Sequence, residues 1–124
     1  MSKKSILVVD DEPDLLDFLR EVLEMNGHTV LGAGSGAEAL EVWGKNAERI
    51  DLLLTDLTLP QGMTGVALGE KLQAQKPALK IIYNSGYDRA MVTEKYSLPP
   101  DAIFLKKPFN PDALARVVQF CFAT

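Results

Sequence analysis

Five short apolar segments alternate along this chain with stretches in which apolar residues recur at helical spacing. Each apolar segment is continuous rather than alternating with polar residues, which is typical of strands that helices cover on both faces of a parallel sheet. We expect the strands at residues 6–9, 28–31, 51–55, 80–83 and 102–105. An α/β fold with a five-stranded parallel sheet is therefore predicted.

Helices are expected between and after these strands, from Pro13 to Asn26, over residues 37–47 and 66–75, and from Asn110 onward. Asp11 or Glu12 can cap the first helix, and Gly27 supplies the left-handed residue that ends it. The sequence does not decide whether residues 88–97 form a short helix or an irregular connection, because the Leu-Pro-Pro sequence at 98–100 forces extended chain. Right-handed crossovers in so short a chain favour a doubly wound (βα)5 fold with the flavodoxin-like strand order 2-1-3-4-5.

Length and charge limit the classes of function. The 124 residues suffice for one domain, residues 1–124, and the formal net charge is −4. This acidic balance argues against direct nucleic-acid binding and against adhesion to an anionic membrane. No apolar run approaches the roughly 18 residues of a spanning helix, and the single cysteine, Cys121, cannot form an intramolecular disulfide. We therefore expect a cytoplasmic protein without membrane insertion.

Reactive side chains gather where the expected strands end. Asp10 and Asp11 follow the first strand, Asp56 the third, Ser85 the fourth and Lys107 the fifth. The carboxyl ends of parallel strands meet at one edge of the sheet, where ligands bind in such folds. Three carboxylates would repel one another there unless a cation neutralised them, and oxygen ligands suit Mg²⁺. A metal, an ammonium and a hydroxyl facing a carboxylate predict phosphoryl transfer onto that carboxylate.

Four segments resemble the receiver domain of bacterial two-component response regulators: ILVVDDEP at 6–13, LLLTDLTLP at 52–60, Ser85-Gly86 and FLKKPF at 104–109. The resemblance extends essentially from end to end. It implies that Asp56 is the phosphoacceptor and that Mg²⁺ is held by Asp10, Asp11, Asp56 and the backbone carbonyl of Thr58. It further implies that the phosphoryl group is stabilised by Ser85 and by Lys107, not Lys106, and that the Lys107–Pro108 peptide is cis.

The resemblance also implies a switch and a class of partner. A sensor histidine kinase or a histidine phosphotransfer protein would donate the phosphoryl group. The chain would be no enzyme beyond catalysing its own phosphorylation and slow dephosphorylation. Ser85 would move toward the phosphoryl group, and Phe104, which lacks a hydroxyl, would move inward by packing alone. The fourth helix, fifth strand and fifth helix would form the readout surface, in a monomer or a weak phosphorylation-dependent dimer whose downstream target is unknown.

Two loops are similar to those of receivers fused to the C-termini of hybrid histidine kinases: residues 61–65, which are rich in glycine, and Ser85-Gly86-Tyr87. In the family, the positions two residues past the phosphoacceptor and two past the hydroxyl residue tune access of water. Thr58 and Tyr87 occupy these positions, and we expect the bulky Tyr87 to shield an acyl phosphate. Kinase specificity is expected on the first helix and on the loop after the fifth strand.

Two alternatives explain less of the sequence. Residues 32–37, Gly-Ala-Gly-Ser-Gly-Ala, fit a dinucleotide-binding pattern with Asp56 downstream for a ribose contact. That interpretation leaves Asp10, Asp11 and Lys107 without a role. A pseudo-receiver, which keeps the fold without phosphorylation, usually lacks an acid or the lysine, and all are present here. A Ser-His-Asp hydrolase is excluded because His28 is expected at a surface turn away from the strand ends.

Overall fold

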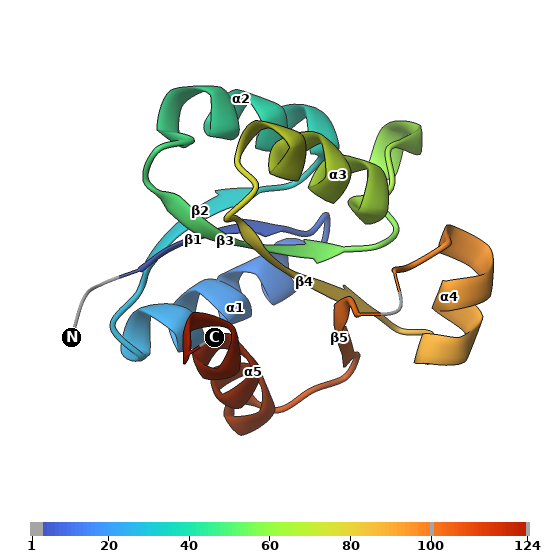
Figure 1. The fold of residues 1–124 in the computed structure, drawn as a ribbon. Helices are drawn as coiled ribbons and strands as arrows, with labels where there is room; N and C mark the ends of the chain where they lie inside the picture. The colour runs from blue at the N-terminus through green and yellow to red at the C-terminus, as the bar shows by residue number, and fades with distance from the viewer. Residues whose placement is uncertain (1–3, 100, 124) are drawn as a thin grey trace.

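Figure 1 shows the chain in a computed structural model, which describes residues 4–99 and 101–123. One sheet contains five parallel strands: β1 (Ser5–Val9), β2 (Thr29–Ala33), β3 (Ile50–Asp56), β4 (Lys80–Ser85) and β5 (Ile103–Lys106). The strand order is β2-β1-β3-β4-β5, which confirms the predicted doubly wound, flavodoxin-like arrangement. The second strand lies slightly later in the chain than expected, because its ladder with β1 pairs Ser5 with Thr29 and Val9 with Ala33.

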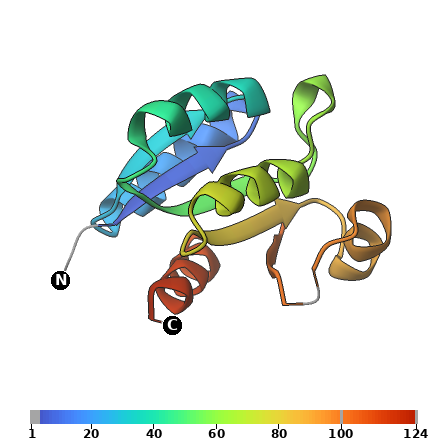
Figure 2. The same cartoon turned by 45° about the horizontal axis from the view of Figure 1, so that its top comes forward.

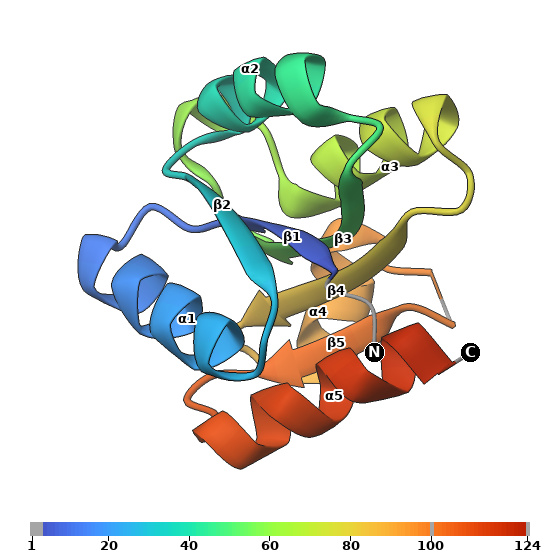
Figure 3. The ribbon, with the colours of Figure 1, turned by 90° about the vertical axis from the view of Figure 1, so that its left-hand side faces the viewer.

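The helices form layers on both faces of the sheet: α1 (Pro13–Met25), α2 (Gly36–Asn46), α3 (Gly65–Gln75), α4 (Arg89–Tyr96) and α5 (Pro111–Ala123). Helices α1 and α5 cover one face, and α2 and α3 cover the other (Figure 3). Among the described residues, no helix combines the length and the apolar character needed to cross a membrane.

Apolar packing on the two faces follows the alternation of side chains along each strand. Toward α1 and α5, the buried side chains include Ile6, Val8, Leu52, Leu54, Ile82 and Leu105. Toward α2 and α3, they include Leu7, Val9, Leu53, Trp43, Leu68 and Leu72. Strands β1 and β3 contribute buried side chains to both clusters. Each is therefore a continuous apolar run in the sequence, as expected for a sheet covered on both sides.

Side-chain caps begin most of the helices. The N-cap residues Ser35, Thr64 and Asp88 each accept a hydrogen bond from the backbone N–H three residues later, at 2.9 to 3.1 Å. Such caps satisfy backbone donors that have no partner inside the helix. Helix α1 differs, because Glu12 occupies the N-cap position but its side chain makes no capping bond. Its end agrees with the sequence, since Gly27 has φ +90°.

The segment left open by the sequence, residues 88–97, forms the short helix α4. Asp88 caps its start, Val92 is its one buried side chain, and Ser97 ends it in the left-handed conformation at φ 55°. Directly after this residue, Leu98 returns to the core at 3% exposure. The Leu-Pro-Pro sequence thus does not prevent a short helix before it.

The connection from β3 to α3 contains a 3-10 turn (Pro60–Gly62) that projects beyond the sheet (Figure 2). Gln61 and Gly62 both have positive φ, at 68° and 83°. An isolated antiparallel bridge between Thr58 and Thr64 closes the loop at its base. The loop then returns against the end of β3, where the Gly65 N–H donates to the Leu57 carbonyl at 2.9 Å.

Lys76 ties together three segments at the opposite end of β3. Its ammonium donates to the backbone carbonyls of Ala47, Glu48 and Ile50, at 3.0, 3.3 and 2.5 Å. One side chain after α3 thus satisfies carbonyls at the end of α2 and at the start of β3. Charged donors make the stronger hydrogen bonds in proteins, so this contact fixes where β3 begins.

Glycine at position 65 is required by close packing against the end of β3. A Cβ atom there would lie 2.2 Å from the Asp56 carbonyl oxygen, whereas a Cβ atom at Gly44 in α2 would have no neighbour within 4 Å. We expect Gly65→Ala to lower the free energy of unfolding by about 2 kcal/mol or more. Gly44→Ala should raise it by about 0.5 kcal/mol, because alanine is the better helix former. Urea denaturation of both variants measures the difference, and equal effects would contradict the packing argument.

Candidate functional site

Two aspartates lie side by side at the carboxyl end of the sheet. Asp10 follows β1 directly and Asp56 ends β3, where Val9 pairs with Thr55. Both side chains are buried, with 1% and 8% of the residue exposed. Asp56 lies two and four residues after Leu54 and Leu52, so it projects on the α1–α5 face with them. Parallel register alone therefore brings the two carboxylates together.

Lys107 connects these carboxylates to the end of β5. Its Nζ lies 2.9 Å from Asp56 Oδ2 and 3.1 Å from Asp10 Oδ2, with Glu12 Oε1 farther away at 3.8 Å. The Lys107–Pro108 peptide is cis, and the Lys107 N–H donates to the Ser85 carbonyl at 2.7 Å. Lys106 is exposed, and its ammonium lies 3.5 Å from the Lys107 carbonyl. The structure thus brings Lys107, and not Lys106, to the aspartates.

The second oxygen of each carboxylate accepts a backbone hydrogen bond. The Glu12 N–H donates to Asp10 Oδ1 at 2.9 Å, and the Thr58 N–H donates to Asp56 Oδ1 at 3.1 Å. Each carboxylate is therefore held between one backbone N–H and one ammonium. Such contacts fix the orientation of the acids before any ligand arrives.

Burial dominates the electrostatics of the site. It raises the pKa of Asp10 above its ordinary value, against the lowering effect of the hydrogen bonds from Glu12 and Lys107. Burial also disfavours the charge of Lys107, but the hydrogen bonds to Asp56 and Asp10 outweigh it and raise the pKa of this lysine. The ammonium is therefore held as a cation by the two acids that it contacts.

Asp10, Asp11 and Asp56 form a group that fits a hard divalent cation. One carboxylate oxygen from each lies within 4.8 Å of the others, with Asp11 exposed and the other two buried. Within residues 4–99 and 101–123, no other cluster of three or more potential metal ligands of this kind occurs. Oxygen-only ligation that leaves room for water is the preference of Mg²⁺. These residues therefore fit the ion that the sequence predicted.

The histidine and the cysteine lie elsewhere. Cys121 is buried in the core on α5. The expectation that His28 occupies a surface turn is wrong in part, because the ring is half-buried and lies 5.5 Å from the Phe122 ring. This burial lowers the pKa of His28. The contact could not be expected locally, since Phe122 belongs to the last helix.

Three further residues of the predicted site are Ser85, Thr58 and Phe104. Ser85 is 2% exposed, and its Oγ accepts a hydrogen bond from the Tyr87 N–H at 3.1 Å. Thr58 is exposed, and its hydroxyl lies 2.7 Å from the Tyr96 hydroxyl at the end of α4. Phe104 on β5 is half-buried against a cluster formed by Leu57, Val66, Tyr83, Val92 and Leu98.

Sequence reasoning gave no role to Asn84 and Tyr96. Asn84 pairs with Asp56 across β3 and β4, is 0% exposed, and has no hydrogen-bond partner for either amide atom among the described residues. Tyr96 reaches the site only through the placement of α4. The position of Asn84, a polar residue at the end of an apolar strand, was the one sequence signal that could have indicated a place in the site. No comparable local signal marked Tyr96.

The glycines of residues 32–37 have structural roles. The Gly34 N–H donates to Glu38 Oε1 at 2.5 Å, and a Cβ atom at Gly36 would lie 2.5 Å from Met63 Sδ. Asp56, which the dinucleotide interpretation assigned to a ribose, instead pairs with Lys107. Packing and helix capping therefore account for this pattern.

Known proteins match the chain over nearly its whole length. The response regulator receiver domain family matches residues 6–119. The response regulator receiver protein CpdR of Brucella abortus (strain 2308) is 35% identical over 116 residues, covering 94% of each chain. The sensor kinase CckA of the same organism is 34% identical over 117 residues, which cover 93% of this chain but only 12% of the kinase. Sporulation initiation phosphotransferase F of Bacillus subtilis (strain 168) is 30% identical, over 96% of this chain and 94% of that protein.

Solved structures agree with these relatives. A response regulator receiver protein from Sinorhizobium medicae WSM419 has a TM-score of 0.87 at 29% identity and covers 99% of this chain and 97% of its own. The receiver domain from the hybrid histidine kinase CckA has a TM-score of 0.78 at 31% identity, with coverages of 94% and 97%. The latter match confirms the expected similarity to receivers of hybrid kinases. The chain therefore belongs to the response regulator receiver domains of two-component systems.

Proposed function

We propose that the chain accepts a phosphoryl group on Asp56 from a phosphohistidine of a sensor histidine kinase or a histidine phosphotransfer protein. The observation that carries this proposal is the joint contact of the Lys107 ammonium with Asp56 and Asp10, beside an acidic group of metal-binding size. A structural ion pair would not need the third, exposed carboxylate of Asp11. A nucleophilic carboxylate, a metal site and a fixed cation together serve phosphoryl transfer.

In the proposed reaction, an Asp56 carboxylate oxygen attacks phosphorus as the bond from phosphorus to the histidine nitrogen breaks. Asp10, Asp11, Asp56 and the Thr58 carbonyl would hold Mg²⁺, which neutralises charge on the phosphoryl oxygens when bound. The Lys107 ammonium would leave the carboxylate for a phosphoryl oxygen. Ser85 supplies a hydroxyl donor two residues before Tyr87, whose N–H now holds its oxygen.

The acyl phosphate would change the charge at the buried end of β3. The phosphoryl group carries about −1.5 to −2 charges at neutral pH in place of the single charge of the carboxylate, and the present ion pairs do not balance this excess. The proposed response is a shift of Ser85 toward the phosphoryl group, after which Phe104 moves inward to fill the vacated space. The surface of α4, β5 and α5 would carry the signal, because α4 buries only one side chain and so moves at low cost.

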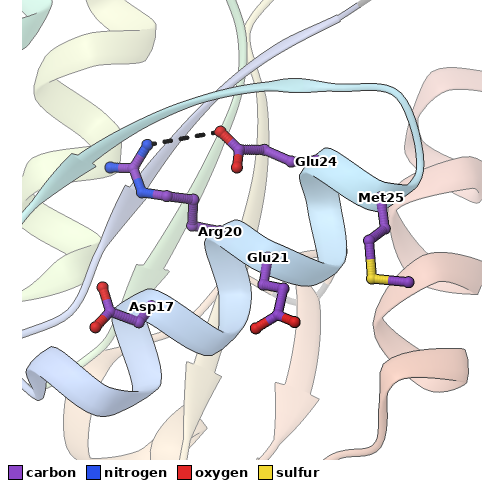
Figure 4. Close-up of a pocket in the computed structure, with 5 residues that line it drawn as sticks. All are labelled: Asp17, Arg20, Glu21, Glu24 and Met25. Atoms are coloured by element: carbon purple, nitrogen blue, oxygen red, sulfur yellow. Dashed lines mark ion pairs between the residues drawn. The ribbon is translucent and has the colours of Figure 1, made fainter.

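The donor protein is proposed to dock on α1 and on the loop after β5. Figure 4 shows the outer side of α1, where Asp17, Glu21 and Met25 lie beside the Arg20–Glu24 ion pair of 3.8 Å. Met25 is 80% exposed, which is unusual for a large apolar side chain. Met25 ends α1 just before β2, at the end of the sheet away from Asp56, so a transient protein contact that used it would extend along the whole of α1. We propose that the chain acts in the cytoplasm, as a monomer or a weak phosphorylation-dependent dimer.

Incubation with acetyl phosphate and Mg²⁺ should add the mass of one phosphoryl group to the intact protein. The Asp56→Asn variant should show no gain, because it lacks the nucleophile. Asp51→Asn is the matched control, since Asp51 lies at the other end of the same strand and accepts a hydrogen bond from the Ser5 N–H. Mass spectrometry reads the outcome. Absence of the adduct in the wild-type protein would favour a pseudo-receiver.

Replacement of Asp10 by Asn should separate stability from metal binding. Because burial raises the pKa of Asp10 on folding, the ionised carboxylate destabilises the folded state at pH values above that pKa. Asp10→Asn should therefore raise the melting temperature in the presence of EDTA, and the gain should shrink as the pH falls toward protonation of the wild-type carboxyl.

Addition of Mg²⁺ should raise the melting temperature of the wild-type protein and leave that of Asp10→Asn unchanged. The exposed Asp17→Asn on α1 serves as the control for loss of one negative charge. If Mg²⁺ stabilised Asp10→Asn as much as the wild-type protein, Asp10 would not belong to the metal site.

Tyr87 is proposed to shield the acyl phosphate from water. Its ring lies 5.6 Å from the Lys95 ammonium, which also lies 5.5 Å from the Tyr96 ring, so one cation links the two tyrosines. We expect Tyr87→Ala to speed dephosphorylation about threefold or more, which corresponds to roughly 0.6 kcal/mol in the barrier. Met91→Ala on α4 removes a similarly exposed side chain and should not change the rate. Phosphate release after removal of donor measures both, and an unchanged Tyr87→Ala rate would refute the shield.

A further inference from the structure

Asn84 is a buried polar residue whose hydrogen-bonding capacity is unused. It is 0% exposed, and within the described part of the chain neither its Nδ2 nor its Oδ1 has a hydrogen-bond partner. A buried amide without partners loses its hydrogen bonds to water and gains none in return, so this strand would be more stable with an apolar residue here. Such a group calls for an explanation in terms of the chemistry beside it.

The sheet register places Asn84 in the same row as the two aspartates. Val9 pairs with Thr55, so Asp10 and Asp56 are the next residues of their strands, and Asp56 pairs with Asn84. Neighbouring strands lie about 4.8 Å apart. Alternation also puts Asn84 on the same face as Ile82, which packs with Leu54 and Leu105 on the α1–α5 side. The amide is therefore the direct neighbour of the phosphoacceptor carboxylate.

The side chain of Lys107 passes over the strand that carries Asn84. Lys107 follows β5, yet its ammonium contacts Asp56 on β3 and Asp10 beyond β1. Strand β4 lies between β5 and β3 in the sheet. Any withdrawal of the ammonium from the aspartates toward its own strand brings it back across β4, where Asn84 offers a buried acceptor.

A divalent cation would compete with this ammonium for the same two carboxylates. Asp10 and Asp56, which bind Lys107, both belong to the acidic group of metal-binding size. Two cations sharing these carboxylates repel each other strongly in a partly buried site. Once a metal is bound, the ammonium therefore needs another acceptor until a phosphoryl oxygen becomes available.

We propose that Asn84 is a positioning residue for Lys107, whose displaced ammonium donates to Asn84 Oδ1 when a divalent cation occupies the aspartates. The inference rests on the proposed metal site. It gives the unused hydrogen-bonding capacity of Asn84 a role, because the amide oxygen is the acceptor to which the displaced ammonium moves. The amide keeps the lysine beside Asp56 during the interval between metal binding and phosphoryl transfer.

The variants Asn84→Thr and Asn84→Val form a matched pair, because they share a shape and differ in one hydroxyl acceptor. Titration with Mg²⁺, followed by the backbone amide resonances of Glu12 and Thr58, gives the dissociation constant. We expect Asn84→Val to weaken Mg²⁺ binding about tenfold, as the loss of one hydrogen bond from a charged donor does, and Asn84→Thr to stay within about threefold of wild type. Asn84→Ser and Asn84→Ala replace the pair if valine prevents folding.

The Lys107 ammonium gives a second readout that general repacking of the core would not move. With ¹⁵N-labelled lysine, the Mg²⁺-bound wild-type and Asn84→Thr proteins should retain a slowly exchanging Lys107 Nζ signal. Asn84→Val should lose that signal on addition of Mg²⁺ and keep it in EDTA, where the aspartates hold the ammonium.

Three outcomes decide the matter. Different Mg²⁺ affinities and Nζ signals for the threonine and valine variants support the inference. Equal values for the two, with the wild-type protein binding Mg²⁺, overturn it and leave the proposed function intact. Failure of the wild-type protein to bind Mg²⁺ removes the metal site and the inference with it. Ile82→Val, on the same strand and face but away from the acids, controls for changes in packing.

Discussion

The ion pairs of Lys107 hold together the end of the sheet on which the site depends. One ammonium joins the end of β5 to Asp56 on β3 and to Asp10 after β1. Without it, two buried carboxylates in adjacent positions would repel each other, and burial already raises the pKa of Asp10. Under the proposed function, the contact that relieves this repulsion is the one that a metal or a phosphoryl group would have to replace.

The parts of this site that sequence could predict are those that strand register alone positions. Asp10, Asp56, Ser85 and Lys107 follow apolar runs directly, and a parallel sheet aligns the ends of such runs. The strand order followed from the alternation of elements and the handedness of crossovers. Local sequence was sufficient here because each residue is placed by its own strand.

Residues placed by packing between distant segments could not be predicted in this way. The Tyr96 hydroxyl contacts the Thr58 hydroxyl only because Val92 anchors α4 beside the sheet. The sequence did not decide whether this helix forms, because prolines follow it. His28 is covered by Phe122 from the other end of the chain. Asn84 reads as the start of a polar turn, and its complete burial depends on neighbours in β3 and β5. In each case the deciding contact lies far away in sequence.

Lys76 restrains the start of β3 against movement along the strand axis. Its ammonium donates to the carbonyls of Ala47, Glu48 and Ile50 at and just before the start of the strand. At the other end, the Lys107 ammonium forms an ion pair with Asp56. The start of β3 therefore stays fixed even if Lys107 releases Asp56, as the proposed function requires. Under that proposal, charge added at Asp56 would be accommodated by the neighbours of β3, among them β4, rather than by movement of β3 along its own axis.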